Sequence, residues 1–384
     1  MQLRTFFQSM VALACLVAPR PSAAQASGFA LNRFEPSERG SDWFVNDSLD
    51  LRGSTNVAAG VVLDWSYKPL VLHEGGGAQG RPLGNVVTDA VFAHSGISFT
   101  WRDRLRFAFN LPVALYQAGD DVSQAAREVR APHGASLGDL RLAADLRVIG
   151  LYGDVFTAAL GLQLHAPTGR PSQLTSDGTF RLTPQVLMAG DGEGLLYAAK
   201  LGFSYRPLND SFEARKLGSE AVFSIAGGVR VNDLFVFGPE LYGSTVVTGD
   251  TALQARATPL ELLLGFHVTL AKHWQFGAGI GPGFTRGDGT PSMRTALSIE
   301  YAPDVCVDKD GDGICAPMDA CPDVDGVRTG ERSTNGCPGD RDHDGVNDKD
   351  DACREQPGAP SDDAAKNGCP AGTEQEPPKA VQPD

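Results

Sequence analysis

The sequence predicts an all-β protein, an antiparallel β-barrel of roughly twelve strands followed by a short repetitive tail. Three observations lead to this prediction. Apolar and polar residues alternate over many segments, the gaps between those segments are alternately short and long, and the composition changes abruptly after Pro303. The 45 glycines and the lack of a clear 3.6-residue period also favour strands over helices.

The segment 104–116 shows the alternation most clearly. Its odd-numbered positions carry the apolar side chains Leu105, Phe107, Phe109, Leu111, Val113 and Leu115. The even-numbered positions are polar or small, and the same two-residue period recurs over 139–148 and 156–165. A strand with this period has one apolar and one polar face. Its repetition over segments of about ten residues is typical of a transmembrane β-barrel.

Twelve such segments fit between residues 57 and 302. They are 57–72, 86–101, 104–116, 136–149, 154–166, 179–189, 195–206, 220–231, 234–246, 257–270, 273–286 and 292–302. The gaps between them alternate between short and long until the last gap, 287–291. Outer-membrane barrels have short periplasmic turns and long external loops, so an even number of strands returns both ends of the chain to the periplasm. We therefore expect a barrel over 57–302 in the outer membrane, with the tail in the periplasm.

Charged residues fall repeatedly on the polar face of these segments. The candidates for the barrel lumen are Arg104, Arg106, Asp139, Arg141, Asp145, Arg147, Glu261, Arg294 and Glu300. A charge that faced lipid near the midplane would cost about 2–4 kcal/mol, so this one-sided placement supports a barrel. The mixed signs allow two interpretations, a salt-bridged plug or a narrow aqueous pore.

The amino end predicts export. Residues 1–26 combine Arg4, an apolar core over 10–17 and the small-residue site Ala24-Gln25-Ala26, which is typical of a secretory signal peptide. No run of eighteen apolar residues follows it, which excludes a helical membrane span. Residues 27–56 are polar with scattered aromatics. They could be a periplasmic lead-in, a plug in the lumen or part of the first strand.

The tail carries most of the charge. The formal net charge is −14, and residues 304–384, with 20 acidic and 8 basic residues, contribute −12 of it. Such a segment attracts cations and not nucleic acid. It also holds six of the seven cysteines, which suggests disulfides formed in an oxidising compartment. Residues 371–384 are rich in proline and acidic residues, and we expect them to be disordered.

Two copies of a D-x-D-x-D-G motif, thirty-two residues apart, indicate metal chemistry. They place carboxylates at Asp308, Asp310 and Asp312, and again at Asp340, Asp342 and Asp344. Carboxylates at every second residue converge on one ion when the chain wraps, and hard oxygen ligands suit Ca²⁺. A further aspartate lies eleven residues after the first in each copy, at Asp319 and Asp351. Because only the second copy adds Asp348 at the ninth position, we expect the Asp340 site to be the better formed.

The cysteines of the tail are also periodic. Cys321 and Cys337 are sixteen apart, as are Cys353 and Cys369. Six cysteines allow fifteen connectivities, of which pairing between neighbours, with Cys306 joined to Cys315, is the simplest. Zinc is disfavoured because no CxxC spacing is present.

These motifs resemble known families. Residues 304–370 resemble thrombospondin type 3 repeats, and the resemblance implies that Ile314 and Val346 supply carbonyl ligands to Ca²⁺. The whole chain resembles OmpA-like outer-membrane proteins of myxobacteria, which share short sequence motifs such as Arg33-Phe34-Glu35-Pro36 and Asn110-Leu111-Pro112. Members of that family commonly continue into a peptidoglycan-binding domain. Here a Pro-rich stretch follows Cys369 instead, which argues against anchoring to the cell wall by that route.

No catalytic motif stands out. His94 and Ser95 are adjacent on a strand and point to opposite faces, so they cannot pair as base and nucleophile. We therefore expect a protein that is not an enzyme and that binds the outer-membrane bilayer. The leading hypothesis is a structural role in the envelope, with a periplasmic protein or the cell wall as partner of the tail. The alternatives are a passive channel for small solutes and a secreted calcium-dependent adhesion protein.

Overall fold

The computed structural model describes residues 28–370, apart from 53–54, 75–79, 125–126, 193, 208–210, 213–214, 233, 249–251, 304–307, 313, 316–317 and 332. The expected signal peptide, 1–26, and the Pro-rich end, 371–384, therefore lie outside the described residues. The chain divides into two compact units, Met1–Pro303 and Asp304–Asp384.

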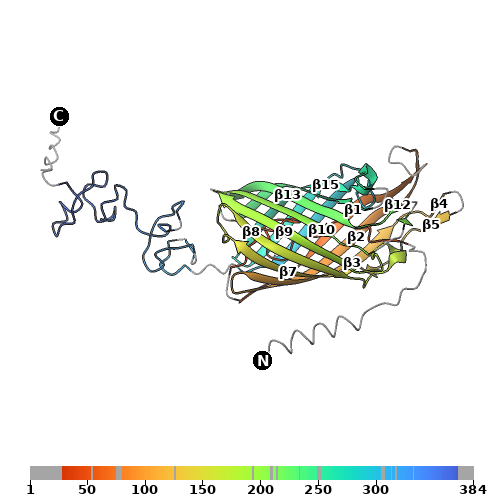
Figure 1. The fold of residues 1–384 in the computed structure, drawn as a ribbon, viewed down its shortest axis with the longest axis horizontal. Coiled ribbons are helices and arrows are strands. Elements are labelled where there is room, and N and C mark those ends of the chain that lie inside the picture. Colours follow the sequence, from red (N-terminus) through yellow and green to blue (C-terminus); the bar gives the residue numbers. More distant parts are fainter. Residues whose placement is uncertain are drawn as a thin grey trace, which may run out of the picture. The chain divides into compact units, whose positions relative to one another are not determined.

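Twelve long strands form the first unit. They are β1 (Thr55–His73), β2 (Pro82–Trp101), β3 (Leu105–Ala118), β7 (Leu140–Ile149), β8 (Thr157–Ala166), β9 (Arg181–Gly192), β10 (Leu195–Ser204), β13 (Glu220–Val231), β14 (Phe235–Val246), β15 (Leu260–Leu270), β16 (Trp274–Gly281) and β17 (Met293–Tyr301). Each pairs antiparallel with the long strands before and after it, and β17 pairs with β1. The sheet thus closes into a barrel (Figure 1). The prediction of an antiparallel barrel of roughly twelve strands is confirmed.

The two faces of this barrel differ as the alternation predicts. Phe109 on β3 points outward and keeps 40% of its surface exposed, whereas the inward residues Arg106 and Asn110 of the same strand keep 2% and 3%. Large apolar side chains cover the outside of the other strands too, while charged and polar groups fill the inside. An apolar outer band around a polar lumen is the arrangement of a transmembrane β-barrel. None of the helices in the described residues is long and apolar enough to cross a membrane.

Short turns and long loops gather at opposite ends of the barrel. Small elements lie in the long connections: β4 (Val122–Gln124), β5 (Arg127–Val129), β6 (Ser136–Leu137), η2 (Pro171–Gln173), β11 (Ser211–Phe212), β12 (Arg215–Lys216) and η3 (Ala255–Ala257). The segment expected at 136–149 is divided into β6 and β7. The reason lies on the facing strand, where Pro112 has no N–H to donate, so Gly138 bonds the Pro112 carbonyl outside a regular ladder.

Residues 28–52 lie inside the barrel, and we call this segment the plug. It has no regular strand, and most of its residues are buried. At the long-loop end, the backbone N–H of Ala30 bonds Asp177 in the loop after β8. At the short-turn end, Asp42 pairs with Arg230 and Tyr152, beside the turns that follow β13 and β7. The chain therefore passes down the lumen from the long loops to the short turns before it enters β1.

Apolar residues pack the plug at both ends. Phe29 and Leu31 join residues of β1, β2 and the loops in one cluster near the long loops. Trp43 and Leu49 pack with side chains of β8, β9, β10 and β14 in a second cluster. Phe34 and Phe44 belong to a third, with Tyr242 and Leu263. Of the three interpretations for 27–56, the plug agrees with the burial of 28–52, whereas 55–56 belong to the first strand, β1.

The second unit has a different construction. Its described residues form turns, bends and single β-bridges, Val327–Cys337 and Ala359–Cys369, in two repeats thirty-two residues apart. Ile314 and Val346 are the buried apolar residues of these repeats, one in each. So small an apolar core leaves the fold dependent on other contacts.

Candidate functional site: the plugged lumen and the acidic repeats

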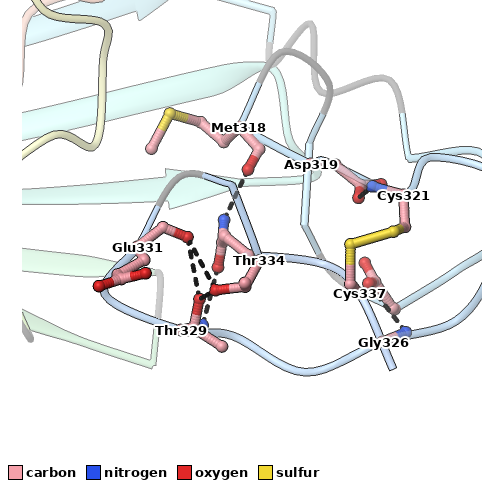
Figure 2. The surroundings of a disulfide bond; sticks show 10 residues. Met318, Asp319, Cys321, Gly326, Thr329, Glu331, Thr334 and Cys337 are labelled. Atoms are coloured by element: carbon pink, nitrogen blue, oxygen red, sulfur yellow. Dashed lines mark hydrogen bonds between the residues drawn. A yellow bond between two sulfur atoms is a disulfide. The ribbon is translucent and has the colours of Figure 1, made fainter. Parts of the chain in front are cut away.

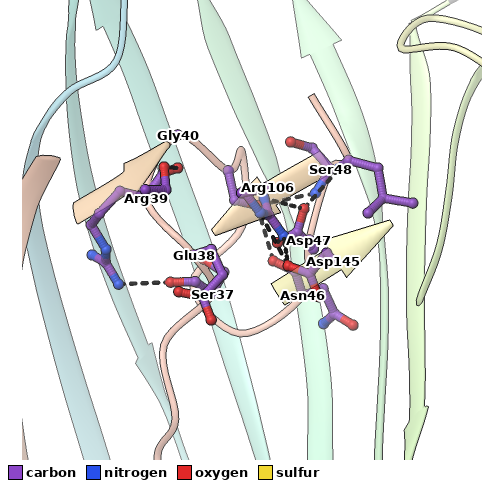
Figure 3. A network of polar contacts seen from close by, with 12 residues as sticks. Ser37, Glu38, Arg39, Gly40, Asn46, Asp47, Ser48, Arg106 and Asp145 are labelled. Atoms are coloured by element: carbon purple, nitrogen blue, oxygen red, sulfur yellow. Dashed lines mark hydrogen bonds and ion pairs between the residues drawn. The ribbon is translucent and has the colours of Figure 1, made fainter. Parts of the chain in front are cut away.

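Charged residues of the barrel wall meet charged residues of the plug. Arg106 on β3 donates from Nη1 to Asp47 of the plug at 3.0 Å and from Nη2 to Asp145 on β7 at 2.8 Å (Figure 3). All three side chains are almost fully buried. One guanidinium therefore pairs with two carboxylates, one from the wall and one from the plug, in a buried site.

Further pairs join plug and wall around the lumen. Arg39 of the plug lies 2.7 Å from Glu300 on β17, and Glu38 lies 3.1 Å from Arg141 on β7. Arg33 lies 3.1 Å from Glu220 on β13. Because these strands lie on different sides of the barrel, the plug is held from several directions.

A carboxylate of the wall also satisfies the plug backbone. Glu240 on β14 is fully buried and accepts hydrogen bonds from the backbone N–H groups of Phe44, Val45 and Asn46, at 2.6, 2.9 and 2.9 Å. The side-chain amide of Asn46 adds a fourth at 3.0 Å. Buried N–H groups without partners are costly, so Glu240 does for the plug what a neighbouring strand does in a sheet.

A second buried cluster lies under Phe34. Arg294 on β17 donates to Glu261 on β15 at 2.8 Å and also to Asp64 on β1. Asp64 in turn lies 2.8 Å from Nε2 of His94 and accepts from Asn32 of the plug. His94 is thus occupied in this charged network.

The predicted lumen residues fall into three groups. Arg106, Arg141, Asp145, Glu261, Arg294 and Glu300 lie inside and belong to the pairs above. Asp139 and Arg147 are also buried, but Asp139 accepts the backbone N–H of Gly169 in a loop and Arg147 donates to the carbonyl of Asp103 in a turn. The placement of Arg104 in the lumen is wrong. Arg104 lies in the turn before β3 and is exposed, because the strand begins one residue later than the alternation suggested.

Cavities remain between plug and wall among the described residues, and two of them share lining residues. The first, about 50 Å³, is lined by residues that include Asn110, Arg141, His165 and Arg181. The second, about 60 Å³, is lined by residues that include Lys200 and Glu220. Glu35 and Arg181 line both. The plug therefore fills the lumen without eliminating all of its polar space.

The acidic motifs of the tail converge as the spacing predicts. In each copy the three carboxylates lie close enough that one oxygen from each falls within 4.8 Å of the others. Asp312 and Asp344 also stabilise their loops. Each accepts a hydrogen bond from a backbone N–H fourteen residues later in the sequence, that of Gly326 at 3.2 Å and that of Gly358 at 2.9 Å. Gly345 has φ of +87°, the sharp turn for which the motif needs glycine.

Several carboxylate oxygens have no donor. Both oxygens of Asp342, and Oδ2 of Asp310 and of Asp319, are buried and have no hydrogen-bond partner among the described residues. Loss of solvation, together with the nearby carboxylates of Asp344 and Asp351, raises the pKa of Asp342 above its usual value. Crowded oxygens that lack donors fit a cation.

The remaining predicted ligands are less directly placed. Asp319 and Asp351 each accept the backbone N–H two residues ahead through Oδ1, while Asp348 accepts the N–H of Arg341 through Oδ1 at 3.1 Å. Asp348 is thus outside the three-carboxylate group. The residues Ile314 and Val346, whose carbonyls the resemblance implies as ligands, directly follow the motifs and have buried side chains.

Disulfides close the two repeats. Cys321 is bonded to Cys337 and Cys353 to Cys369, the neighbour pairing that seemed simplest. Figure 2 shows the first of these, between Cys321 and Cys337. In the same repeat, the side-chain amide of Asn335 donates to the carbonyl of Met318 at 2.6 Å. Cys315 is disulfide-bonded as well, whereas Cys306 lies outside the described residues.

The barrel matches a known family. A family model described as "Putative MetA-pathway of phenol degradation" matches residues 75–299. The chain belongs to this family. The match covers most of the barrel but neither the plug nor the acidic repeats, and it is a different family from the OmpA-like one that the sequence resembles. No curated protein matches the chain.

Several solved structures match part of the chain at low identity and with TM-scores below 0.5. The COG4313 outer membrane channel from Pseudomonas putida F1 is 15% identical, with 65% of this chain and 96% of that chain covered and a TM-score of 0.49. The NanC porin is 10% identical, with coverage of 64% and 100% and a TM-score of 0.41. The toluene transporter TodX of Pseudomonas putida is 10% identical, with coverage of 72% and 98% and a TM-score of 0.37.

In this member of the phenol-degradation family, sequence reasoning missed two wall residues that hold the plug, Glu220 and Glu240. Both lie on regular strands, and a systematic count of charges on the polar face would have found them. Glu35 and Asp47 are different. They lie in an irregular segment with no period, so no pattern indicates which wall residue each would meet.

Proposed function

We propose that the protein is an outer-membrane channel for small solutes, with a lumen closed by its own plug. The observation that carries the proposal is the charged, cavity-containing lumen around residues 28–52. A purely structural barrel has no need of polar space inside. The family description, which refers to phenol degradation, also favours a role in solute uptake over the structural role that the sequence analysis placed first.

The orientation follows from general barrel architecture. Short turns face the periplasm in outer-membrane barrels, so the start of β1, the end of β17 and the tail would be on that side. The plug would then begin near the cell surface and end near the periplasm. This arrangement supports a channel that is not an enzyme, because the charged groups of the lumen are paired with one another and hold the plug.

Conductance tests this function. The purified chain should form small, rare openings in planar bilayers, and the double variant Arg39→Gln/Glu240→Gln should open more often because two contacts of the plug are lost. Asp89→Asn is the matched control, since Asp89 accepts from Trp65 and does not contact the plug. Conductance at the lipid background for both the wild type and the double variant would refute the channel.

We also propose that the tail binds Ca²⁺ and becomes rigid when it does. Asp308, Asp310 and Asp312 would hold one ion, and Asp340, Asp342 and Asp344 another. Asp319, Asp348 and Asp351, with the carbonyls of Ile314 and Val346, would complete the ligand sets. Bound Ca²⁺ would neutralise the crowded carboxylates and supply the stabilisation that the small apolar core lacks. The relation to thrombospondin type 3 repeats remains part of this proposal.

A further inference from the structure

Glu35 of the plug stands between the two lumen cavities. Its Oε1 lies 3.3 Å from Nε2 of His165 on β8 and 3.3 Å from Nη1 of Arg181 on β9. We propose that His165 and Arg181 form a binding site for small monocarboxylate solutes, which Glu35 occupies in the closed protein and which a solute carboxylate can take over. The inference rests on the proposed channel function and names the class of solute.

The side chain of Glu35 is more exposed than those of other acidic residues of the plug. Its side chain keeps 34% of its surface exposed, whereas those of Glu38 and Asp47 keep 6%. Since Glu35 lines both cavities, this exposed surface faces polar space inside the barrel. A solute in either cavity would therefore reach the groups that hold Glu35.

The cavities have the size of a small organic acid. A water-sized group needs roughly 10–15 Å³ of such space, so cavities of about 50 and 60 Å³ each take a few heavy atoms. Formate and acetate fall in this range. A larger acid would require part of the plug to move as well.

The cavity walls offer donors that lack acceptors. Nε of Arg141 and Nδ2 of Asn110 are buried, have no hydrogen-bond partner among the described residues, and belong to side chains that line the first cavity. In the second cavity, the ammonium of Lys200 lies 3.3 Å from the carbonyl of Val45, and no carboxylate of the described residues pairs with it. Donors in excess select a ligand rich in acceptors.

Charge then selects a carboxylate among such ligands. Arg181 also lies 3.3 Å from Asp177, which keeps the guanidinium in place when Glu35 leaves. Exchange of the Glu35 carboxylate for a solute carboxylate conserves the net charge around Arg181. A neutral solute would leave one buried cation less compensated, which is costly.

Equilibrium binding to the full chain in detergent micelles tests the site. The probe is ¹³C-labelled acetate, titrated and followed by NMR line broadening, with neutral acetamide as a comparison ligand. Glu35→Gln removes the competing carboxylate, so the variant should bind acetate at least about tenfold more tightly than the wild type does. The reason is that the tethered Glu35 carboxylate competes at millimolar or higher effective concentration. Asp42→Asn is the matched control, because it removes one plug carboxylate that lines neither cavity.

A second variant tests the proposed receptor. Glu35→Gln/Arg181→Gln should lose the gained acetate affinity, while heat-modifiable gel migration shows whether the barrel is still folded. The proposal is overturned if Glu35→Gln binds acetate no better than Asp42→Asn, if acetamide binds as well as acetate, or if the double variant keeps the gain. This binding needs no conduction. A conducting protein without acetate binding would refute only this site, and acetate binding without conductance would refute only the channel.

Discussion

Glu240 on β14 holds Asn46 of the plug by two hydrogen bonds to one oxygen, from the backbone N–H at 2.9 Å and from the side-chain amide at 3.0 Å. The plug has no strand ladder of its own, so its buried backbone groups depend on side chains of the wall. This relation makes the barrel carboxylates part of the plug fold.

Glu240→Gln should therefore loosen the plug. The amide of glutamine points an N–H where one carboxylate oxygen accepted, and charged hydrogen bonds are worth about 1.5–3 kcal/mol each. We expect docking of the plug to weaken by about 2–3 kcal/mol, and hydrogen exchange at Phe44, Val45 and Asn46 to accelerate. Asp89→Asn should leave these amides unchanged. Equal protection in the wild type and in Glu240→Gln would show that the carboxylate is dispensable.

An outward and an inward position on β3 should respond differently to substitution. Phe109→Arg places a charge on the outer face, at a cost of about 2–4 kcal/mol near the midplane, and should block insertion. Arg106→Leu leaves Asp47 and Asp145 buried without their cation, which costs about 3–5 kcal/mol, yet the outer face stays apolar. Heat-modifiable migration and membrane fractionation separate the two effects. We expect Arg106→Leu to insert but to unfold at a lower temperature, and failure to insert would contradict this.

The sequence predicts the strands better than the lumen for a physical reason. A strand repeats its signal over about ten residues, so an error at one position hardly matters. The outcome for Arg104 shows the limit, because a two-residue period does not mark where the turn begins. The plug has no repeat at all. Its contacts, such as that between Arg39 and Glu300, join residues 261 apart, and only the closed barrel brings them together.

The disulfides Cys321–Cys337 and Cys353–Cys369 should make similar contributions. Each closes a loop with a sequence separation of 16, and loss of a bridge over a loop of about that length costs about 3 kcal/mol. Replacing both Cys353 and Cys369 by Ser should open the second repeat to protease and leave the first protected. Limited proteolysis with peptide mapping measures this. Equal protection of both repeats would show that the bridge contributes little to the folded repeat.

Calcium should decide whether the tail resists protease. Its net charge of −12 is self-repulsive, and ordering costs about 1–2 kcal/mol per residue for the backbone, so the repeats need the ions. Titration of the oxidised full chain should give at least two Ca²⁺ per chain, and chelation should open the repeats to protease.

Asp342→Ala should lower the stoichiometry by one, because both of its oxygens are buried without donors. Asp350→Ala, an exposed aspartate beside Asp351, is the matched control. The second repeat should release its ion last, since Asp348 lies near that loop and has no counterpart in the first. Equal Ca²⁺ stoichiometry for Asp342→Ala and Asp350→Ala, with heat-modifiable barrels in both, would refute the calcium site. The tail would then be an acidic linker.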